Sequence, residues 1–195
     1  MRIIITFSAL VISACSPMDE YPNRYFDYSG KDGCKPANIG HRLGGDLPEY
    51  GPNSLEGMYA IEFMQKERCF KNWEFDINQS KDSVVLAHDT HINNVALIYI
   101  ETSNLPAGMV TLDKFISSFA SLNVTKPVVF DIKNIPDQRY WPSLLNSAVA
   151  IKNQHGVDVW FIMSSEVSEK HQGFCQLVND SFDVMLYSRG GYLCN

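Results

Sequence analysis

Short apolar runs alternate with stretches whose apolar residues recur at helical spacing, and this alternation constrains the fold most. The expected strands cover residues 38–42, 73–78, 84–88, 127–133, 157–163 and 182–187. Helical stripes begin at Leu112 and at Trp141, and a further helix is expected over residues 166–179. Apolar strands that alternate with helices favour an α/β fold, with a parallel sheet covered on its outer face.

The helix between the first two strands has a recognisable start. Asn53 is expected to cap it, and Glu56 three residues on completes the pattern of a capping box. The spacing predicts that the helix buries a stripe formed by Leu55, Met58, Tyr59 and Phe63.

Composition bounds the class of protein. The chain has 195 residues, of which 45% are hydrophobic and 19% charged, so it suits one well-packed domain and not a disordered protein. Its 16 Lys and Arg against 22 Asp and Glu give a net charge of −6, with no basic cluster. A nucleic-acid partner is therefore not expected. Glycine motifs of dinucleotide and nucleoside-triphosphate sites are absent from the sequence.

The first residues have the character of an export signal. Met1 and Arg2 precede an apolar run over residues 3–13 that is too short to span a membrane. The segment Ile12-Ser13-Ala14-Cys15 resembles the lipobox of bacterial lipoproteins, which implies lipidation at Cys15; an ordinary signal cut near Ala14 is the alternative. We therefore expect a signal peptide over residues 1–14, a tether over 15–36 and one folded α/β domain over 37–195. Such a protein would be exported to the bacterial cell envelope and held by acyl chains at the outer membrane or the periplasmic face.

With Cys15 lipidated, an even number of cysteines remains. They are Cys34, Cys69, Cys175 and Cys194. In an exported chain they permit two disulfides in three possible pairings, of which 34–69 and 175–194 close the shortest loops. A structural zinc site is the competing interpretation, but the sequence has no CxxC pair.

Ionisable residues stand on the first four expected strands or at their ends. They are His41 and Arg42, Glu74 and Asp76, His88 and Asp89, and Asp131 and Lys133. Alternate residues of a strand face the same side, and the carboxyl ends of barrel strands form the rim where catalytic groups gather. We therefore expect these side chains to converge.

Their chemistry suits hydrolysis of a phosphodiester. Carboxylates from two strands can hold a hard divalent cation such as Mg²⁺ or Ca²⁺. Two histidines can act as general acid and general base, and Arg42 and Lys133 can bind a phosphate. Singly, each signal has a structural interpretation, such as an ion pair or a turn cap. His91, His155 and His171 are assigned to the surface or the core.

These residues belong to sequence motifs that resemble those of a known protein family. The motifs are Ile39-Gly40-His41-Arg42, Asn53-Ser54-Leu55-Glu56, Trp73-Glu74-Phe75-Asp76-Ile77, the run from Ser80 to Asp89, Thr111-Leu112, and Val129-Phe130-Asp131-Ile132-Lys133. Their order and spacing resemble the glycerophosphodiester phosphodiesterase family. That family has a TIM-barrel fold shared with phosphatidylinositol-specific phospholipase C, uses Mg²⁺ or Ca²⁺, and releases glycerol 3-phosphate and an alcohol.

The resemblance implies a role for each matched residue. His41 and His88 would be the acid/base pair, although the sequence does not say which is which. Arg42 and Lys133 would contact the phosphate of a small-molecule phosphodiester. The metal ligands would be Glu74, Asp76 and Asp131.

The chain departs from the family pattern at four places. Leu43 replaces a glycine, Pro52 replaces a glutamate, and Asp131 stands where a longer glutamate is usual. The segment over residues 90–110 is short and lacks the usual Arg-Thr-Thr.

The length predicts an incomplete TIM-type (β/α) barrel. About six of the usual eight strands are expected, because such barrels generally need 200 residues or more. Two alternatives to hydrolysis stay open: a degenerate barrel that binds a phosphorylated ligand or an envelope partner, and a lyase that forms a cyclic phosphate. The oligomeric state is not predicted.

Overall fold

The computed structural model describes residues 30, 32–164, 167, 173–178, 183–186 and 191–192. The expected signal peptide, Cys15, His171, Cys194 and the side chain of Cys175 lie outside these residues. Within the described residues, no helix is both long and apolar enough to cross a membrane.

Most strands belong to one sheet. They are β1 (Trp73–Gln79), β2 (Val84–Leu86), β5 (Val110–Thr111), β6 (Val128–Asn134), β7 (Val159–Met163), β8 (Asp183–Leu186) and β9 (Gly191–Tyr192). Their order is β5-β2-β1-β6-β7-β8-β9, and β3 (His91–Ile92) pairs with β4 (Val95–Ala96) in a separate two-stranded sheet.

The helices lie between these strands along the chain. The α-helices are α2 (Leu55–Ile61), α3 (Leu112–Phe119), α4 (Trp141–His155) and α6 (Phe174–Val178). The 3₁₀ turns in the described part of the chain are η1 (His41–Leu43), η2 (Glu62–Lys66), η3 (Leu97–Tyr99), η4 (Thr102–Asn104) and η5 (Gln138–Tyr140).

The centre of the large sheet is parallel and its edges are antiparallel. Strands β1, β6, β7 and β8 run in parallel, as the alternation of strands and helices predicted. The expectation that residues 84–88 form a parallel strand is wrong, because β2 pairs antiparallel with β1. The turn between them is too short for the crossover that a parallel pair needs. Among the described strands β5 and β9 stand at opposite ends of the sheet, so no closed barrel is present there, in keeping with a partial barrel.

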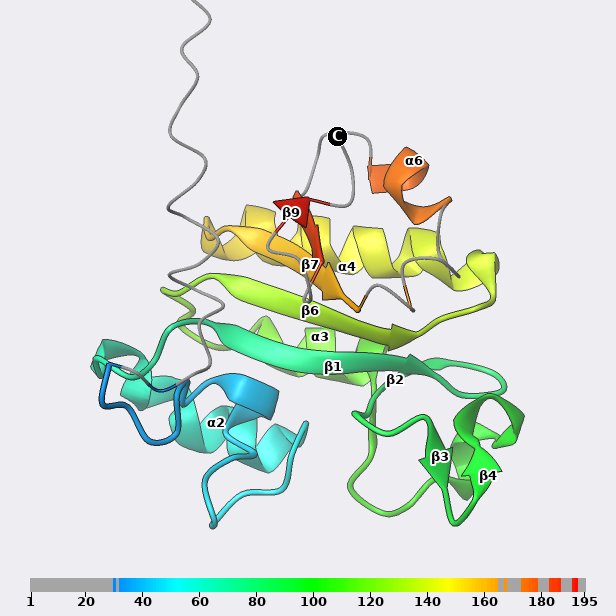
Figure 1. Cartoon of the computed structure of the whole chain (residues 1–195), viewed down its shortest axis with the longest axis horizontal. Coiled ribbons are helices and arrows are strands. Elements are labelled where there is room, and N and C mark those ends of the chain that lie inside the picture. The colour runs from blue at the N-terminus through cyan, green and yellow to red at the C-terminus, as the bar shows by residue number, and fades with distance from the viewer. Residues whose placement is uncertain are drawn as a thin grey trace, which may run out of the picture.

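Alternation along the central strands separates a hydrophobic face from a polar one. Figure 1 shows β1, β6 and β7 side by side with α3 and α4 behind them. Phe75 of β1 packs against Phe115 of α3 and Phe130 of β6, with ring centroids 4.4 and 4.6 Å apart. The residues on either side of Phe75 are Glu74 and Asp76, which therefore point to the opposite face of the sheet.

The strand expected over residues 38–42 is not formed. Residues 38–43 make a turn that ends in η1, in which Arg42 and Leu43 have left-handed φ angles of 48° and 56°. The Asn38 side chain accepts hydrogen bonds from the N–H groups of Gly40 and Lys71 at 3.1 and 2.9 Å. Side-chain bonds of this kind compete with a sheet ladder, and here they hold the turn.

The start of α2 and its buried face also differ from expectation. Ser54, not Asn53, is the N-cap, and its side chain accepts from the N–H of Gly57 at 3.1 Å. Met58 is buried as predicted, but Tyr59 and Phe63 are 48% and 73% exposed. Phe63 lies in η2, where fewer residues per turn take it off the predicted stripe, whereas Tyr59 lies within α2 on its exposed side.

One disulfide ties the N-terminal turn to the residue stretch before β1. It joins Cys34 to Cys69, which is one of the pairings that the sequence allowed. The bond closes a loop across a sequence separation of 35 residues. The crosslink therefore restricts the unfolded chain, and it lies on the segment that also carries His41 and Arg42.

Removing this disulfide is expected to destabilise the fold. The double substitution Cys34→Ala and Cys69→Ala should lower the free energy of unfolding by about 3–4 kcal/mol, since the open loop gains entropy in the unfolded state. Urea denaturation in non-reducing buffer measures the change. An unfolding free energy equal to that of the parent protein would contradict the expectation.

Candidate metal centre

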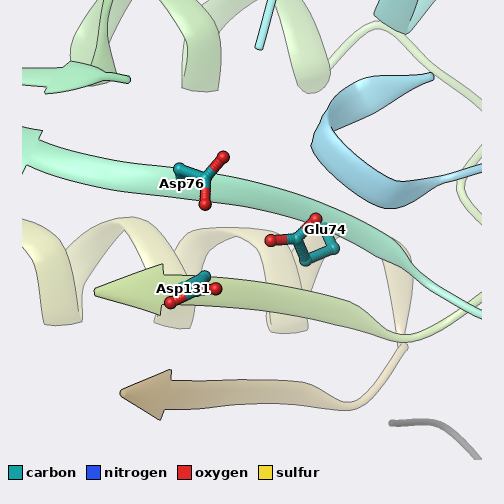
Figure 2. A group of neighbouring side chains, drawn as sticks. All are labelled: Glu74, Asp76 and Asp131. Atoms are coloured by element: carbon teal, nitrogen blue, oxygen red, sulfur yellow. The ribbon is translucent and has the colours of Figure 1, made fainter. Parts of the chain in front are cut away.

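Three carboxylates converge on the polar face of the large sheet. Glu74 and Asp76 lie on β1 and Asp131 lies on β6, where it is in register with Asp76. Figure 2 shows them pointing toward one another from the two adjacent strands. One oxygen from each lies within 4.8 Å of the others, and all three residues are buried. We call these residues the acidic cluster; the structure brings them together as the strand alternation predicted.

Burial makes this cluster electrostatically costly. Desolvation raises the pKa of Glu74 well above its usual value, and the neighbouring carboxylates of Asp76 and Asp131 raise it further. Hydrogen bonding from the backbone of Arg42 and the charge of Lys133 act in the opposite direction without cancelling the rise. Among the described residues, Glu74 Oε1 is buried with no hydrogen-bond partner. A buried carboxylate oxygen without a partner favours a bound cation.

The donor set fits a hard divalent ion. Three carboxylates within reach of one point provide oxygen ligands of the kind that Mg²⁺ and Ca²⁺ prefer. The acidic cluster could therefore bind such a metal, and its donor oxygens do not distinguish the two ions.

Lys133 lies directly against the acidic cluster. Its Nζ is 2.7 Å from Asp131 Oδ2 and 3.0 Å from Asp76 Oδ1. Burial lowers the pKa of Lys133, but the charges of Asp131 and Asp76 outweigh this effect and leave the pKa above its usual value. Lys133 is therefore a fixed positive charge beside the acidic cluster.

The turn at η1 brings two further predicted residues to the cluster. The N–H of Arg42 donates to Glu74 Oε2 at 2.7 Å, and its side-chain Nε lies 3.6 Å from Asp76 Oδ2. His41 Nε2 is 3.6 Å from Glu74 Oε2. The Glu74 N–H in turn donates to the carbonyl of Gly40 at 3.0 Å, so the backbone of β1 holds the turn in place.

Asp46 orients the ring of His41 and was not singled out by the sequence. Its Oδ2 lies 2.5 Å from His41 Nδ1. A carboxylate at Nδ1 favours the tautomer in which this nitrogen carries the proton and Nε2 is the acceptor. Nε2 is the nitrogen on the Glu74 side of the ring. The only sequence signal was a carboxylate a few residues after the histidine, which is too common to be informative.

Asn53 also has a function that the sequence did not indicate. It was expected to cap α2, but its side chain forms two hydrogen bonds with Asp76. Asn53 Nδ2 donates to Asp76 Oδ2 at 2.8 Å, and Asn53 Oδ1 accepts from the Asp76 N–H at 2.9 Å. Asn53 therefore fixes the direction of the Asp76 carboxylate.

Removing the Asn53 side chain tests this positioning. Glycine is chosen because it tolerates the left-handed φ of 56° at this position. Asn53→Gly should lower metal affinity by about 10- to 100-fold. Asn94→Gly is the matched control, because Asn94 is exposed and has a φ of 65°. Calorimetric titration with Ca²⁺ measures both variants. Equal metal affinities of Asn53→Gly and Asn94→Gly would show that Asn53 does not position a metal ligand.

His88 does not lie at the common rim of strand ends where it was expected. Because β2 runs antiparallel to β1, its carboxyl end lies beside the middle of β1 and not at a common rim. The N–H of Ala87 donates to the carbonyl of Asp76 at 3.1 Å, so the backbone directly before His88 is bonded to β1. The His88 ring is half-exposed and pairs with Asp89 at 2.8 Å.

Leu43 shows how the chain tolerates a departure from the family pattern. It has a left-handed φ of 56° where the resembled family has glycine, and its side chain is fully buried in the core. A left-handed residue other than glycine costs about 1–2 kcal/mol. Burial of a leucine contributes about 1.5–3 kcal/mol and offsets that cost.

The other predicted histidines lie away from these contacts. His91 is exposed on β3, and the ring of His155 packs edge-on against Phe119 of the core, with centroids 5.6 Å apart. Both agree with the assignment to the surface or the core.

Comparisons with known proteins identify similar structures only at low similarity. No protein-family model and no curated protein matches the sequence. A glycerophosphodiester phosphodiesterase from Parabacteroides distasonis is similar in structure, with a TM-score of 0.47, 13% identity, and coverage of 74% of this chain and 80% of that one. A candidate glycerophosphoryl diester phosphodiesterase from Agrobacterium tumefaciens has a TM-score of 0.43, 14% identity, and coverage of 76% and 72%. Similarity at this level identifies no function, so the side chains of the site must do so.

Proposed function

We propose that this chain is a metal-dependent phosphodiesterase that hydrolyses a glycerophosphodiester to glycerol 3-phosphate and an alcohol. The observation that carries the proposal is the acidic cluster, whose three buried carboxylates are accompanied by Lys133 and Arg42. Acidic ligands beside fixed positive charges suit a site that takes both a cation and a phosphate. The substrate class comes from the motif resemblance of the sequence.

The charged residues divide into two groups in this proposal. Glu74, Asp76 and Asp131 hold Mg²⁺ or Ca²⁺, which supplies Lewis acidity toward the phosphoryl oxygens when it is bound. Arg42 and Lys133 donate hydrogen bonds to the phosphate and offset the negative charge that develops on it. Both side chains contact the Asp76 carboxylate, Arg42 through Nε at 3.6 Å and Lys133 through Nζ at 3.0 Å, which supports this assignment.

The histidines transfer the protons. With Asp46 accepting from Nδ1, His41 presents Nε2 as the general base that removes a proton from the attacking water. As the new P–O bond forms, the bond to the alcohol breaks. His88 donates a proton to the departing alkoxide, so the charges balance at the end of the step.

A second candidate function is binding of a phosphorylated ligand without turnover. The observation that favours it is the position of the Lys133 ammonium, 2.7 Å from Asp131 and 3.0 Å from Asp76, where it already neutralises part of the acidic cluster. Because the Lys133 ammonium already offsets part of the negative charge of the carboxylates, a bound metal ion would stabilise the cluster less.

The test is product analysis with purified protein on glycerophosphocholine and glycerophosphoethanolamine. The assay is run in EDTA and again with Mg²⁺ or Ca²⁺ restored. Metal-dependent release of glycerol 3-phosphate supports hydrolysis, whereas a cyclic phosphate identifies the lyase reaction. Phosphate binding without any product supports the second candidate.

We also propose that acyl chains on Cys15 anchor the protein in the bacterial cell envelope. The proposal rests on the lipobox-like residues Ile12-Ser13-Ala14-Cys15. Expression of the full chain in a bacterial host with a labelled fatty acid should label the parent protein and leave Cys15→Ser unlabelled. Equal labelling of both would show that Cys15 is not the lipidated residue.

A further inference from the structure

A pocket of about 370 Å³ opens beside His88 and does not include the acidic cluster. One wall is the loop that carries Asn53, and another is the carboxyl end of β2 at Leu86 and Ala87. The remaining wall comes from β3 and from residues 106–109. The short segment over residues 90–110, which differs from the resembled family, thus contributes part of the lining.

The lining is mainly apolar. The side chains that give it this character are Pro52, Leu86, Ala87, Ile92, Pro106 and Met109. The described lining includes no lysine or arginine, so its histidines, His88 and His91, are its only basic side chains and it has no permanent positive charge for a second anionic group. Its one carboxylate, Asp89, has a side chain 82% exposed and pairs with His88, so it offers little to a buried cation.

The floor of the pocket is a packed part of the fold. Val85, Ala87 and Leu97 form a small core of their own, and Ile92 and Met109 pack against it. The chain is folded back onto this core by backbone bonds, among them Leu97 N–H to Thr90 O at 2.8 Å and Lys81 N–H to Ile100 O at 2.9 Å. The apolar walls therefore belong to a built site and not to a loose loop.

Two residues join the pocket to the reacting centre. Asn53 lines the pocket and holds the Asp76 carboxylate at 2.8 Å. His88 lines it as well, and follows Ala87, whose N–H bonds to the Asp76 carbonyl. A group bound in the pocket would thus lie next to the histidine that we assign to the leaving alcohol.

We propose that this pocket binds an uncharged aliphatic alcohol moiety of the phosphodiester, on the leaving side of the phosphate. The inference rests on the proposed function and narrows its substrate class. It excludes diesters whose leaving alcohol carries an anionic group, and it favours alkyl over ammonium-bearing head groups. Substrate preference is then set by burial of apolar surface in the pocket.

The test measures binding of simple alkyl phosphates, which need not be turned over. Methyl, propyl and pentyl phosphate are titrated calorimetrically into the protein with Ca²⁺ present. Each added methylene should tighten binding about twofold to fourfold. Ethanolamine phosphate, whose chain is of similar length to that of propyl phosphate, should bind more weakly than propyl phosphate.

Two substitutions place a charge in the pocket. Ala107→Asp and Met109→Asp should abolish the dependence on chain length and leave the affinity for methyl phosphate unchanged. Ala107 is exposed, so its substitution leaves the fold intact even if Met109→Asp does not. Phe63→Asp is the control, because Phe63 is exposed on η2 and does not line the pocket.

The outcomes separate the inference from the function on which it rests. If methyl phosphate binds and longer chains bind no better, the apolar pocket is not used, while the proposed function stands. Tighter binding of ethanolamine phosphate than of propyl phosphate also overturns the inference. If no phosphate binds at all, the inference and the proposed phosphate site are both wrong.

Discussion

Replacement of His41 by alanine is expected to lower the turnover number for a glycerophosphodiester by about 10²- to 10⁴-fold, which is the usual contribution of a general base. His41 has the geometry for this role: its Nδ1 is held by Asp46 at 2.5 Å, and its Nε2 lies on the acidic cluster side of the ring. The measurement is the rate of glycerol 3-phosphate release at saturating substrate and metal.

The control for this experiment is His155→Ala, because the His155 ring packs against Phe119 on the helix-covered side of the sheet, away from the acidic cluster. It should retain the parent rate. His88→Ala should also lose activity, through loss of the proton donor to the alcohol. Full activity in both His41→Ala and His88→Ala would contradict the assignment of the reaction to this site.

The second large effect is expected for Glu74→Gln. This substitution should change the stability of the metal-free protein and the stabilisation by bound metal in opposite directions. In EDTA at neutral pH, Glu74→Gln should raise the free energy of unfolding by about 1–4 kcal/mol, since glutamine is neutral in the buried cluster without having to take up a proton. It should also abolish the stabilisation that Ca²⁺ or Mg²⁺ gives to the parent protein. Denaturation with and without metal measures both effects.

The sign of the pH dependence follows from the raised pKa of Glu74. A carboxyl whose pKa is higher in the folded than in the unfolded state binds its proton more tightly when folded. Its contribution to stability is complete below the unfolded pKa and is lost as the pH rises through the folded pKa. The metal-free parent protein should therefore lose stability on this rise, and Glu74→Gln should lose less.

Glu56→Gln is the matched control, because Glu56 is exposed on α2. It should leave stability, its pH dependence and the metal effect unchanged. A metal-free Glu74→Gln protein less stable than the parent would mean that the carboxylate is compensated within the fold.

The polar face of the sheet was predictable because it depends on a local rule. Alternation along a strand places Glu74 and Asp76 on one side whatever the strand pairs with. That Asp131 joins them needed only the expectation that the two strands are neighbours. The helices over Leu112–Phe119 and Trp141–His155 were likewise recognised from their apolar spacing.

The residues that support the site were not predictable, because their contacts cross long stretches of chain. Asn53 and Asp76 are 23 residues apart, and a cap for α2 was the simpler local interpretation of an asparagine there. The turn at residues 38–43 was mistaken for a strand for a related reason. Its apolar and polar pattern fits a strand, but the Asn38 side chain and the left-handed Arg42 and Leu43 decide the backbone.

The central claim is that the acidic cluster is a metal centre, and a calorimetric titration of metal-free protein with Ca²⁺ and Mg²⁺ tests it most directly. The parent protein is expected to bind a single ion per chain. Asp131→Asn is expected to weaken that affinity by at least about tenfold, since even supporting residues contribute this much. No binding by the parent protein, or an unchanged affinity in Asp131→Asn, would contradict the metal centre described here.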